Sequence, residues 1–128
     1  MDSKQFIIQL GKKYGFDSSE DVFQVHGKWV VTKTGIQKIV DQEFFTYAFQ
    51  VIEASSDYCA VLCDIGDKDN NRISCSLGSA EACNVKNKQR YYLEMAEKRA
   101  KARAVLMAIG AHGRVYSEDE ADEFKPAK

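Results

Sequence analysis

The stretch NVKNKQRYYLEMAEKRAKARAVLMAIG, from Asn84 to Gly110, decides the fold of this 128-residue chain. Alanine recurs through it, and a glycine follows its last apolar residue, which is typical of a long helix that ends at that glycine. We predict a helix from near Lys88 to Ile109, about 33 Å long at 1.5 Å per residue, which is long enough to cover a small sheet. The stretch holds seven basic and two acidic residues, whereas the whole chain has a net charge of −1. A local positive field of this kind attracts anionic partners.

Two lysines of the predicted helix have acidic neighbours on the same helix. Glu94 stands four residues before Lys98, and Glu97 stands four residues before Lys101. This is the favourable orientation for ion pairs, each worth about 0.2–0.5 kcal/mol. We therefore expect these lysines to belong to a solvated, salt-bridged face.

Two arginines of the same helix lack such neighbours. Arg99 and Arg103 have no acidic residue three or four positions before them, and they share a face with Lys88 and Tyr92. Because guanidinium groups bind phosphate through paired hydrogen bonds, one interpretation is a face that binds a polyanion. The other is that the arginines pair with carboxylates from elsewhere in the fold or from a neighbouring subunit.

Three strands are predicted before the helix, because apolar residues alternate with polar ones there. They are Phe44 to Ala54, Tyr58 to Ile65 and Arg72 to Leu77. The connections at 55–57 and 66–71 are rich in Ser, Asp, Asn and Gly, so both are typical of turns. In the third strand we expect Ile73, Cys75 and Leu77 to face the core.

The first forty residues predict a short helix and a hairpin. Apolar residues at helical spacing predict a helix from Ser3 to Tyr14, and His26-Gly27 between two short apolar runs predicts a hairpin turn. Thr34 is placed to cap a further helical turn. The predicted fold class is α+β: an antiparallel β-meander packed against one long C-terminal helix, with a short N-terminal helix and hairpin.

The chain divides near its C-terminal end. Residues 1–113 are predicted to form a single α+β nucleic-acid-binding domain, a size ordinary for one domain. Residues 114–128 form an acidic tail with five acidic and three basic residues. For this tail we keep open solvation, contact with a protein partner, and competition with nucleic acid for the basic face.

The remaining composition favours a cytoplasmic protein with no membrane partner. No apolar run is long enough to span a bilayer, and the first residues lack the features of a secretory signal. The four cysteines do not have the spacing of a zinc site, so we expect reduced thiols in the core. We predict no metal and no cofactor.

Sequence patterns typical of catalysis are lacking. Neither of the phosphate-binding glycine motifs occurs, nor does G-x-S-x-G or H-E-x-x-H, so we expect no enzymatic activity. One enzymatic alternative remains, a metal-dependent nuclease in which Glu53, Asp64 and Asp67 hold Mg²⁺. Asp67 is better explained by hairpin-turn chemistry.

A family resemblance is carried by Ala96, the pair Arg103-Ala104, Gly110 and Tyr116 with the acidic residues after it. These positions resemble the conserved helix of the single-strand annealing proteins, the superfamily of eukaryotic Rad-fifty-two-like recombination mediators and their phage counterparts. The predicted order of three strands and a long helix is similar to the β-β-β-α core of that family.

The resemblance implies single-stranded DNA binding and strand annealing by a homo-oligomeric ring or filament, in phage- or prophage-type homologous recombination, without cofactor chemistry. We predict that basic side chains neutralise phosphates and that a tyrosine stacks on a base. The alternative is a small non-enzymatic protein-interaction or regulatory module whose basic helix docks into an acidic groove. The predicted nucleic-acid-binding residues are Lys86, Lys88, Arg90, Tyr92, Arg99 and Arg103.

Overall fold

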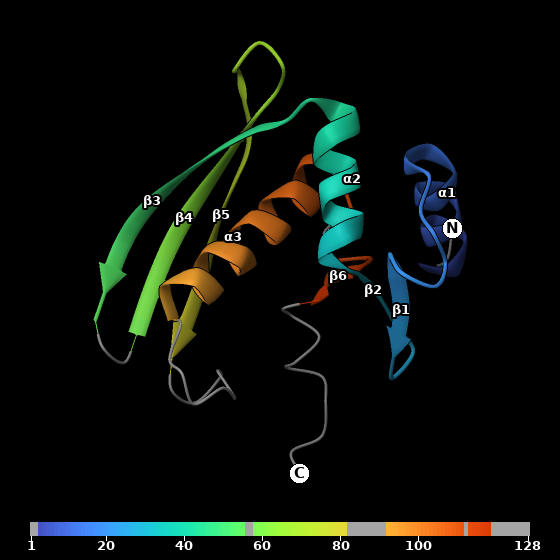
Figure 1. Cartoon of the computed structure of the whole chain (residues 1–128), viewed down its shortest axis with the longest axis horizontal. Coiled ribbons are helices and arrows are strands. Elements are labelled where there is room, and N and C mark those ends of the chain that lie inside the picture. The colour runs from blue at the N-terminus through green and yellow to red at the C-terminus, as the bar shows by residue number, and fades with distance from the viewer. Residues whose placement is uncertain (1–2, 56–57, 82–91, 112, 119–128) are drawn as a thin grey trace.

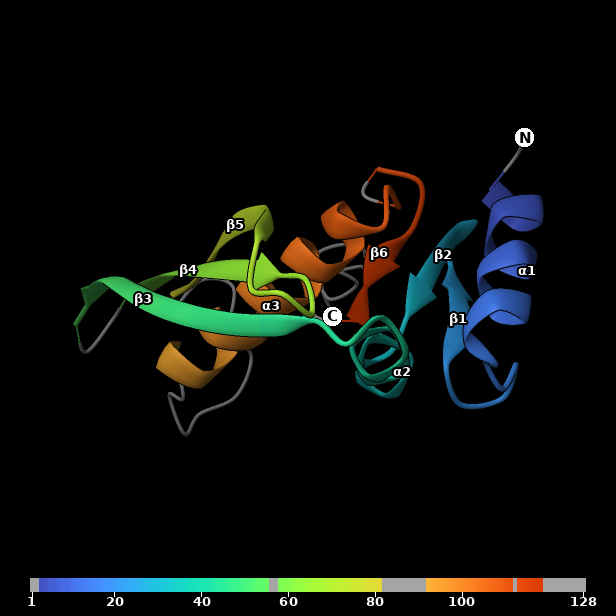
Figure 2. The same cartoon turned by 90° about the horizontal axis from the view of Figure 1, so that it is seen from above.

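The computed structural model describes residues 3–55, 58–81, 92–111 and 113–118, and its fold is α+β, as predicted (Figure 1). A β-meander and a long helix lie at one end of the molecule, and the N-terminal helix and hairpin lie at the other (Figure 2). The elements in chain order are α1 (Ser3–Tyr14), β1 (Val22–Val25), β2 (Lys28–Val31), α2 (Lys33–Glu43), β3 (Thr46–Ala54), β4 (Tyr58–Gly66), β5 (Arg72–Glu81), α3 (Tyr92–Ala108) and β6 (Tyr116–Ser117).

The strands of the described residues form two three-stranded sheets. The meander has the order β3-β4-β5 and is antiparallel throughout, with one register shift between Val51 and Glu53 and another between Ile65 and Gly66. In the other sheet, β1 and β2 form the predicted hairpin, and His26 and Gly27 both have positive φ, as its tight turn requires. The third strand of that sheet, β6, pairs in parallel with β2.

The strand β6 begins inside the segment assigned from sequence to the acidic tail. Val115 and Ser117 are each only 1% exposed, and Ser117 is paired with Val31. The residues from Arg114 to Glu118 are therefore packed on the fold. The rest of the predicted tail lies outside the described residues.

The helix α2 differs from its prediction in its cap and its length. Thr32, not Thr34, is the N-cap, and its hydroxyl oxygen accepts a hydrogen bond from the N–H of Gly35 at 3.4 Å. The helix then continues to Glu43 and ends at Phe44 in the left-handed conformation. The sequence analysis predicted one helical turn here, whereas the structure has a helix of eleven residues.

The orientation of β5 corrects the sequence-based expectation. Ile73 and Leu77 were expected to face the core, but they are 43% and 50% exposed on the side of the sheet away from α3. Ser74 instead faces the helix, where its hydroxyl donates to the carbonyl of Ala104 at 2.7 Å. The helix thus packs on the small side chains of β5.

The physical reason is the close approach between α3 and β5. A Cβ atom added at Gly78 would lie 2.3 Å from the backbone nitrogen of Ala100 and 2.4 Å from the carbonyl oxygen of Ala96. An alanine-lined helix can approach a strand this closely only where the strand presents glycine and serine. An alternating pattern allows either face of a strand to pack against the helix. In β5, the short distance between the backbones of α3 and β5 selects the face with the small residues.

The central strand β4 supplies the larger side chains of this interface. Val61, Cys63 and Ile65 are fully buried, and Cys59 is 4% exposed on the same face. Cys59 and Cys63 are free thiols, as expected, and burial raises the pKa of the Cys63 thiol to about 11. In the part of the chain that the structure describes, no helix has the length and apolar character needed to cross a lipid bilayer.

Candidate nucleic-acid interface

The two arginines of α3 lie against the backbone of β5. Arg99 is 3% exposed, and its Nη1 donates to the carbonyl of Ser79 at 2.7 Å; Arg103 Nη1 donates to the carbonyl of Leu77 at 2.9 Å. Helix positions four apart rise by about 6 Å, and alternate strand residues are about 6.6 Å apart, so the two spacings match. This geometry gives both guanidinium groups a contact within the fold. Their contact with nucleic acid stays a prediction.

The other predicted site residues divide between the core and the undescribed part of the chain. Tyr92 is 6% exposed and packs in a cluster with Cys59, Val61, Ala80 and Ala96. Stacking on a base would require this ring to be exposed, which it is not in this structure. Lys86, Lys88 and Arg90 lie outside the described residues.

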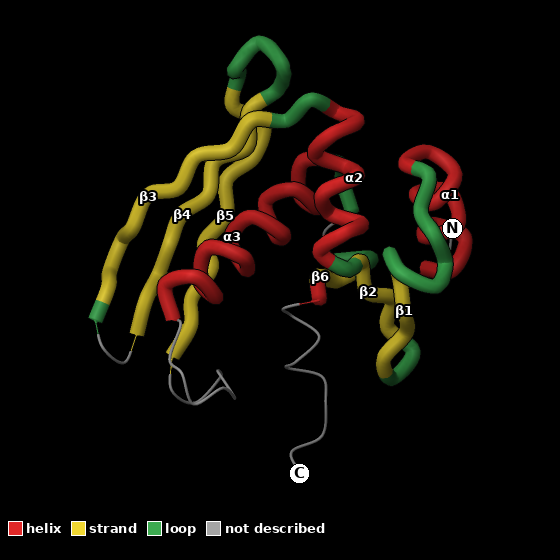
Figure 3. The backbone as a smooth tube through the Cα atoms, in the orientation of Figure 1, coloured by secondary structure: helices red, strands yellow, loops and turns green. Residues whose placement is uncertain are grey.

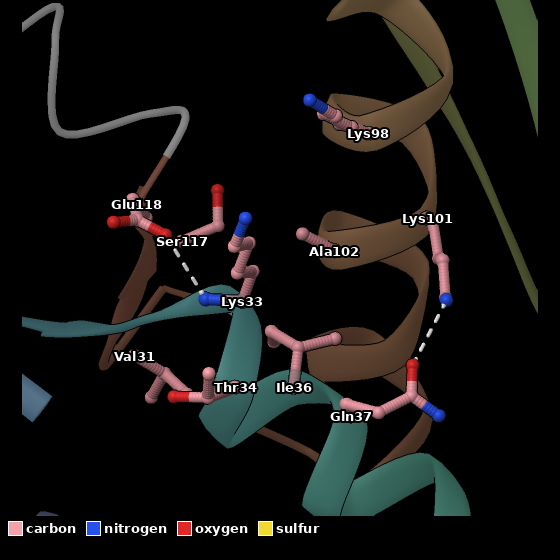
Figure 4. Close-up of a pocket in the computed structure, with 10 residues that line it drawn as sticks. All are labelled: Val31, Lys33, Thr34, Ile36, Gln37, Lys98, Lys101, Ala102, Ser117 and Glu118. Atoms are coloured by element: carbon pink, nitrogen blue, oxygen red, sulfur yellow. Dashed lines mark hydrogen bonds between the residues drawn. The ribbon is translucent and has the colours of Figure 1, made fainter. Parts of the chain in front are cut away.

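A basic groove lies instead between α2, α3 and β6, and it is lined by Lys33, Lys98 and Lys101 (Figure 4). Its open volume is about 600 Å³, and Thr34 and Gln37 add polar groups to its wall. Lys33 is the first residue of α2, whereas the other two lysines are on α3, more than sixty positions later. Tertiary packing therefore gathers charges that are far apart in the sequence.

The predicted ion pairs on α3 do not form. Neither Glu94–Lys98 nor Glu97–Lys101 is paired in the structure, and the Lys98 ammonium has no hydrogen-bond or ion-pair partner among the described residues. Lys101 donates to Gln37 Oε1 at 3.4 Å. The helix α2 packs beside this face of α3, and its Gln37 is the partner that Lys101 contacts.

An exposed aromatic pair lies beside the groove on β3. Tyr47 and Phe49 are 47% and 38% exposed, and their ring centroids are 5.7 Å apart in an edge-to-face arrangement. Lys101 Nζ lies 4.1 Å from the centre of the Tyr47 ring, so one lysine joins the groove to the pair. These rings are on the side of the sheet that α3 packs against, because Tyr47 pairs with Ile65, but the helix crosses β4 and β5 and leaves β3 uncovered (Figure 3).

Sequence analysis missed this aromatic pair as a site. The alternating apolar residues of β3 are the pattern of a half-buried strand, yet every residue of β3 is exposed. One sequence feature could have indicated the site. The segment from Thr46 to Ala54 has two aromatic residues and no proline, lysine or arginine.

A buried hydrogen-bond network holds α2, and so Lys33, in place. The carboxylate of Asp21 accepts from the hydroxyl of Thr34 at 2.7 Å, from the N–H of Asp17 at 2.7 Å, and from the Lys38 ammonium. The backbone carbonyl of Asp21 accepts from the N–H of Thr32 at 2.9 Å. These bonds tie the start of α2 to the turn before β1.

The ionisation of Asp21 contributes to this anchoring. Burial raises the pKa of the Asp21 carboxyl, but the hydrogen bonds from Lys38, Asp17 and Thr34 outweigh that effect and hold the pKa below its ordinary value. The bond to Asp21 is the main reason that the pKa of Lys38 is raised. Because the pKa of Asp21 is lowered, the network stabilises the fold at neutral pH and loses that contribution as the pH falls through this lowered pKa.

Two of the three residues of the nuclease alternative, Asp64 and Asp67, are engaged in other contacts. Asp64 Oδ1 pairs with Arg72 at 2.8 Å, and Asp67 Oδ1 accepts from the N–H groups of Asp69 and Asn71 at 2.9 Å each. Glu53 is opposite Ala60, four positions along β4 from Asp64. Within the described ranges, no group of three or more His, Cys, Asp or Glu side chains is placed to hold a metal ion.

Comparisons with known proteins leave function to be inferred from this geometry. A scan with protein-family models found no match, and searches among curated proteins and among solved structures found none either.

Proposed function

We propose that the protein binds single-stranded DNA across the groove between α2 and α3 and anneals complementary strands as a homo-oligomer in phage- or prophage-type recombination. The observation that carries the proposal is that Lys33, Lys98 and Lys101 line one groove beside an exposed aromatic pair. Proteins that bind single strands without reading sequence combine a basic groove for the backbone with aromatic rings for the bases. Tyr47 and Phe49 are the rings available for that role.

The chemistry of annealing is also compatible with this groove. The reaction requires no nucleophile and no metal, because base pairing itself supplies the free energy. The protein has only to neutralise phosphates and keep bases accessible. Lysines contact phosphate as mobile point charges, so they hold a backbone without selecting a sequence.

The test is fluorescence anisotropy of a labelled oligothymidine, titrated at several salt concentrations. The Lys98→Gln/Lys101→Gln variant should weaken binding at least tenfold, and the slope of log K against log salt should become shallower by roughly 1.4, at about 0.7 per lost phosphate contact. The matched control is Lys4→Gln/Lys12→Gln, which removes the same charge from exposed positions of α1.

Equal weakening by both double variants would contradict the proposal, because it would show a general charge effect and not a groove. Tighter binding to duplex than to single strands would also contradict it. Annealing itself is followed by fluorescence quenching between two complementary labelled strands, which the wild-type protein should accelerate and the groove variant should not.

A protein-interaction module remains the second candidate because β3 is uncovered. Tyr47, Phe49, Val51 and Ile52 are all more than one-third exposed along one strand. A sheet edge of this kind adds strands from other chains. Binding of the oligonucleotide by wild-type protein, with the salt slope above, is the outcome that separates the two functions.

A further inference from the structure

One acidic side chain already occupies the mouth of the basic groove. Glu118 lines the same pocket as the three lysines, and its Oε1 accepts a hydrogen bond from the backbone N–H of Lys33 at 3.0 Å (Figure 4). Lys33 is the first residue of α2, so the carboxylate lies at a helix N-terminus, where unpaired N–H groups and the helix dipole favour an anion. A carboxylate therefore occupies a place that suits a phosphate.

The position of Glu118 is set by the fold. It directly follows β6, whose Tyr116 and Ser117 pair with Val30 and Val31 of β2. Ser117 is 1% exposed, so the chain is packed on the fold up to the residue before Glu118. The chain that continues from Glu118 consequently starts at the groove.

The sequence of that continuation is complementary in charge to the groove. Residues 118–123 carry five carboxylates and no basic residue, whereas the groove carries three ammonium groups. Residues 119–123 follow Glu118 directly in the sequence, so their carboxylates are tethered to a residue that lines the groove. A segment on so short a tether has an effective concentration in about the millimolar range.

We infer that the acidic segment from Glu118 to Glu123 is an internal competitor that occupies the groove in the absence of nucleic acid. This inference rests on the proposed function and adds its regulation. Single-stranded DNA displaces the segment, so the chain binds DNA less tightly than its lysines alone would allow. A ligand that places a single phosphate in the groove does not displace the segment, whereas a long strand that contacts several lysines does.

The experiment compares two full-length variants that lose the same charge. Glu118→Gln/Asp119→Asn should bind the labelled oligothymidine at least threefold more tightly than wild type at low salt. The matched control Glu53→Gln/Asp69→Asn removes two exposed carboxylates that do not line the groove and should change affinity less than 1.5-fold. When Lys98→Gln/Lys101→Gln is added, the tail substitutions should no longer increase the affinity for the oligonucleotide. The reason is that the segment and the DNA then no longer compete for these two lysines.

A second measurement uses no DNA, so that failure of the inference and failure of the proposed function are distinguishable. The ammonium NMR signals of Lys98 and Lys101 and the amide signal of Lys33 should shift between wild type and Glu118→Gln/Asp119→Asn, and not in the control. Unchanged signals overturn the inference. Shifted signals without oligonucleotide binding in any variant support occupation of the groove but overturn its competition with nucleic acid, together with the proposed function.

Discussion

The two edges of the meander are built in opposite ways. At β5, the helix α3 covers the strand, and Arg99 and Arg103 donate to the carbonyls of Ser79 and Leu77. At β3, nine consecutive residues are exposed, without a proline or a basic residue among them. Natural sheets protect their edges with charge, bulges or covering elements, and here only one edge receives full protection.

The two edges therefore differ in what they can contribute: β5 to the stability of the fold, and β3 to contacts with other molecules. The β5 edge contributes to stability, because its contacts with α3 are close and include charged hydrogen bonds. The β3 edge contributes surface, and Tyr47 connects that surface to the basic groove through Lys101. The homo-oligomer of the proposed function would associate through β3, because an uncovered strand edge can pair with a strand of another chain. Substitutions at the two edges should therefore have different consequences.

The largest effect is expected from Gly78→Val at the β5 edge. The new side chain would meet backbone atoms of Ala96 and Ala100, which cannot move without lifting α3 from the sheet. We expect a loss of about 3 kcal/mol or more in the free energy of unfolding, measured by chemical denaturation. The neighbouring change Leu77→Val, on the exposed face, should stay within about 0.5 kcal/mol. Equal stabilities for the two variants would show that the close approach is not rigid.

A smaller effect is expected from removing the arginine contacts one at a time. Arg99→Met should lower the free energy of unfolding by about 2 kcal/mol, because a charged hydrogen bond to Ser79 is lost in a buried place. Arg103→Met, at a half-buried position, should cost about 1 kcal/mol. Thermal melts monitored by circular dichroism check both. An unchanged melt with at least tenfold weaker oligonucleotide binding would instead establish the arginines as DNA contacts, as the sequence predicted.

The smallest effect on folding is expected at the β3 edge. Val51→Lys places a charge on a side chain that is 49% exposed, so the free energy of unfolding should change by no more than about 0.5 kcal/mol. Light scattering after size-exclusion chromatography should nevertheless show smaller assemblies than wild type, with and without an oligonucleotide. Assemblies of unchanged size would place self-association elsewhere and leave β3 without that role.

Much of the fold was predictable because its signals are local. The glycines that follow α1 and α3 have positive φ, as does Gly27 in the hairpin turn, and residues of this type mark such places in any fold. Alternation and helical spacing depend only on neighbouring residues, so the meander, the N-terminal helix and the long helix could be recognised in order. The boundaries moved by a few residues where β5 and α2 run longer than their patterns.

The candidate site was less predictable because it depends on which charges find which partners. Arg99 has no acidic neighbour on its helix, but its donor group is used by a carbonyl twenty residues earlier. Lys98 and Lys101 have acidic neighbours at the ideal spacing, but Lys101 contacts Gln37, 64 residues away. The packing therefore gives Arg99 a partner on β5 and Lys101 a partner on α2, and intrahelical spacing predicts neither contact.

By itself, the sequence determined the elements, their order and the α+β class, because periodicity, turn residues and glycine conformations act over a few residues. Only the tertiary structure decided that β5 turns its small residues toward α3, that β3 stays uncovered, and that Lys33 joins the lysines of α3. The physical reason is that backbone approach and charge pairing are settled between segments distant in the chain, where a local pattern allows more than one outcome.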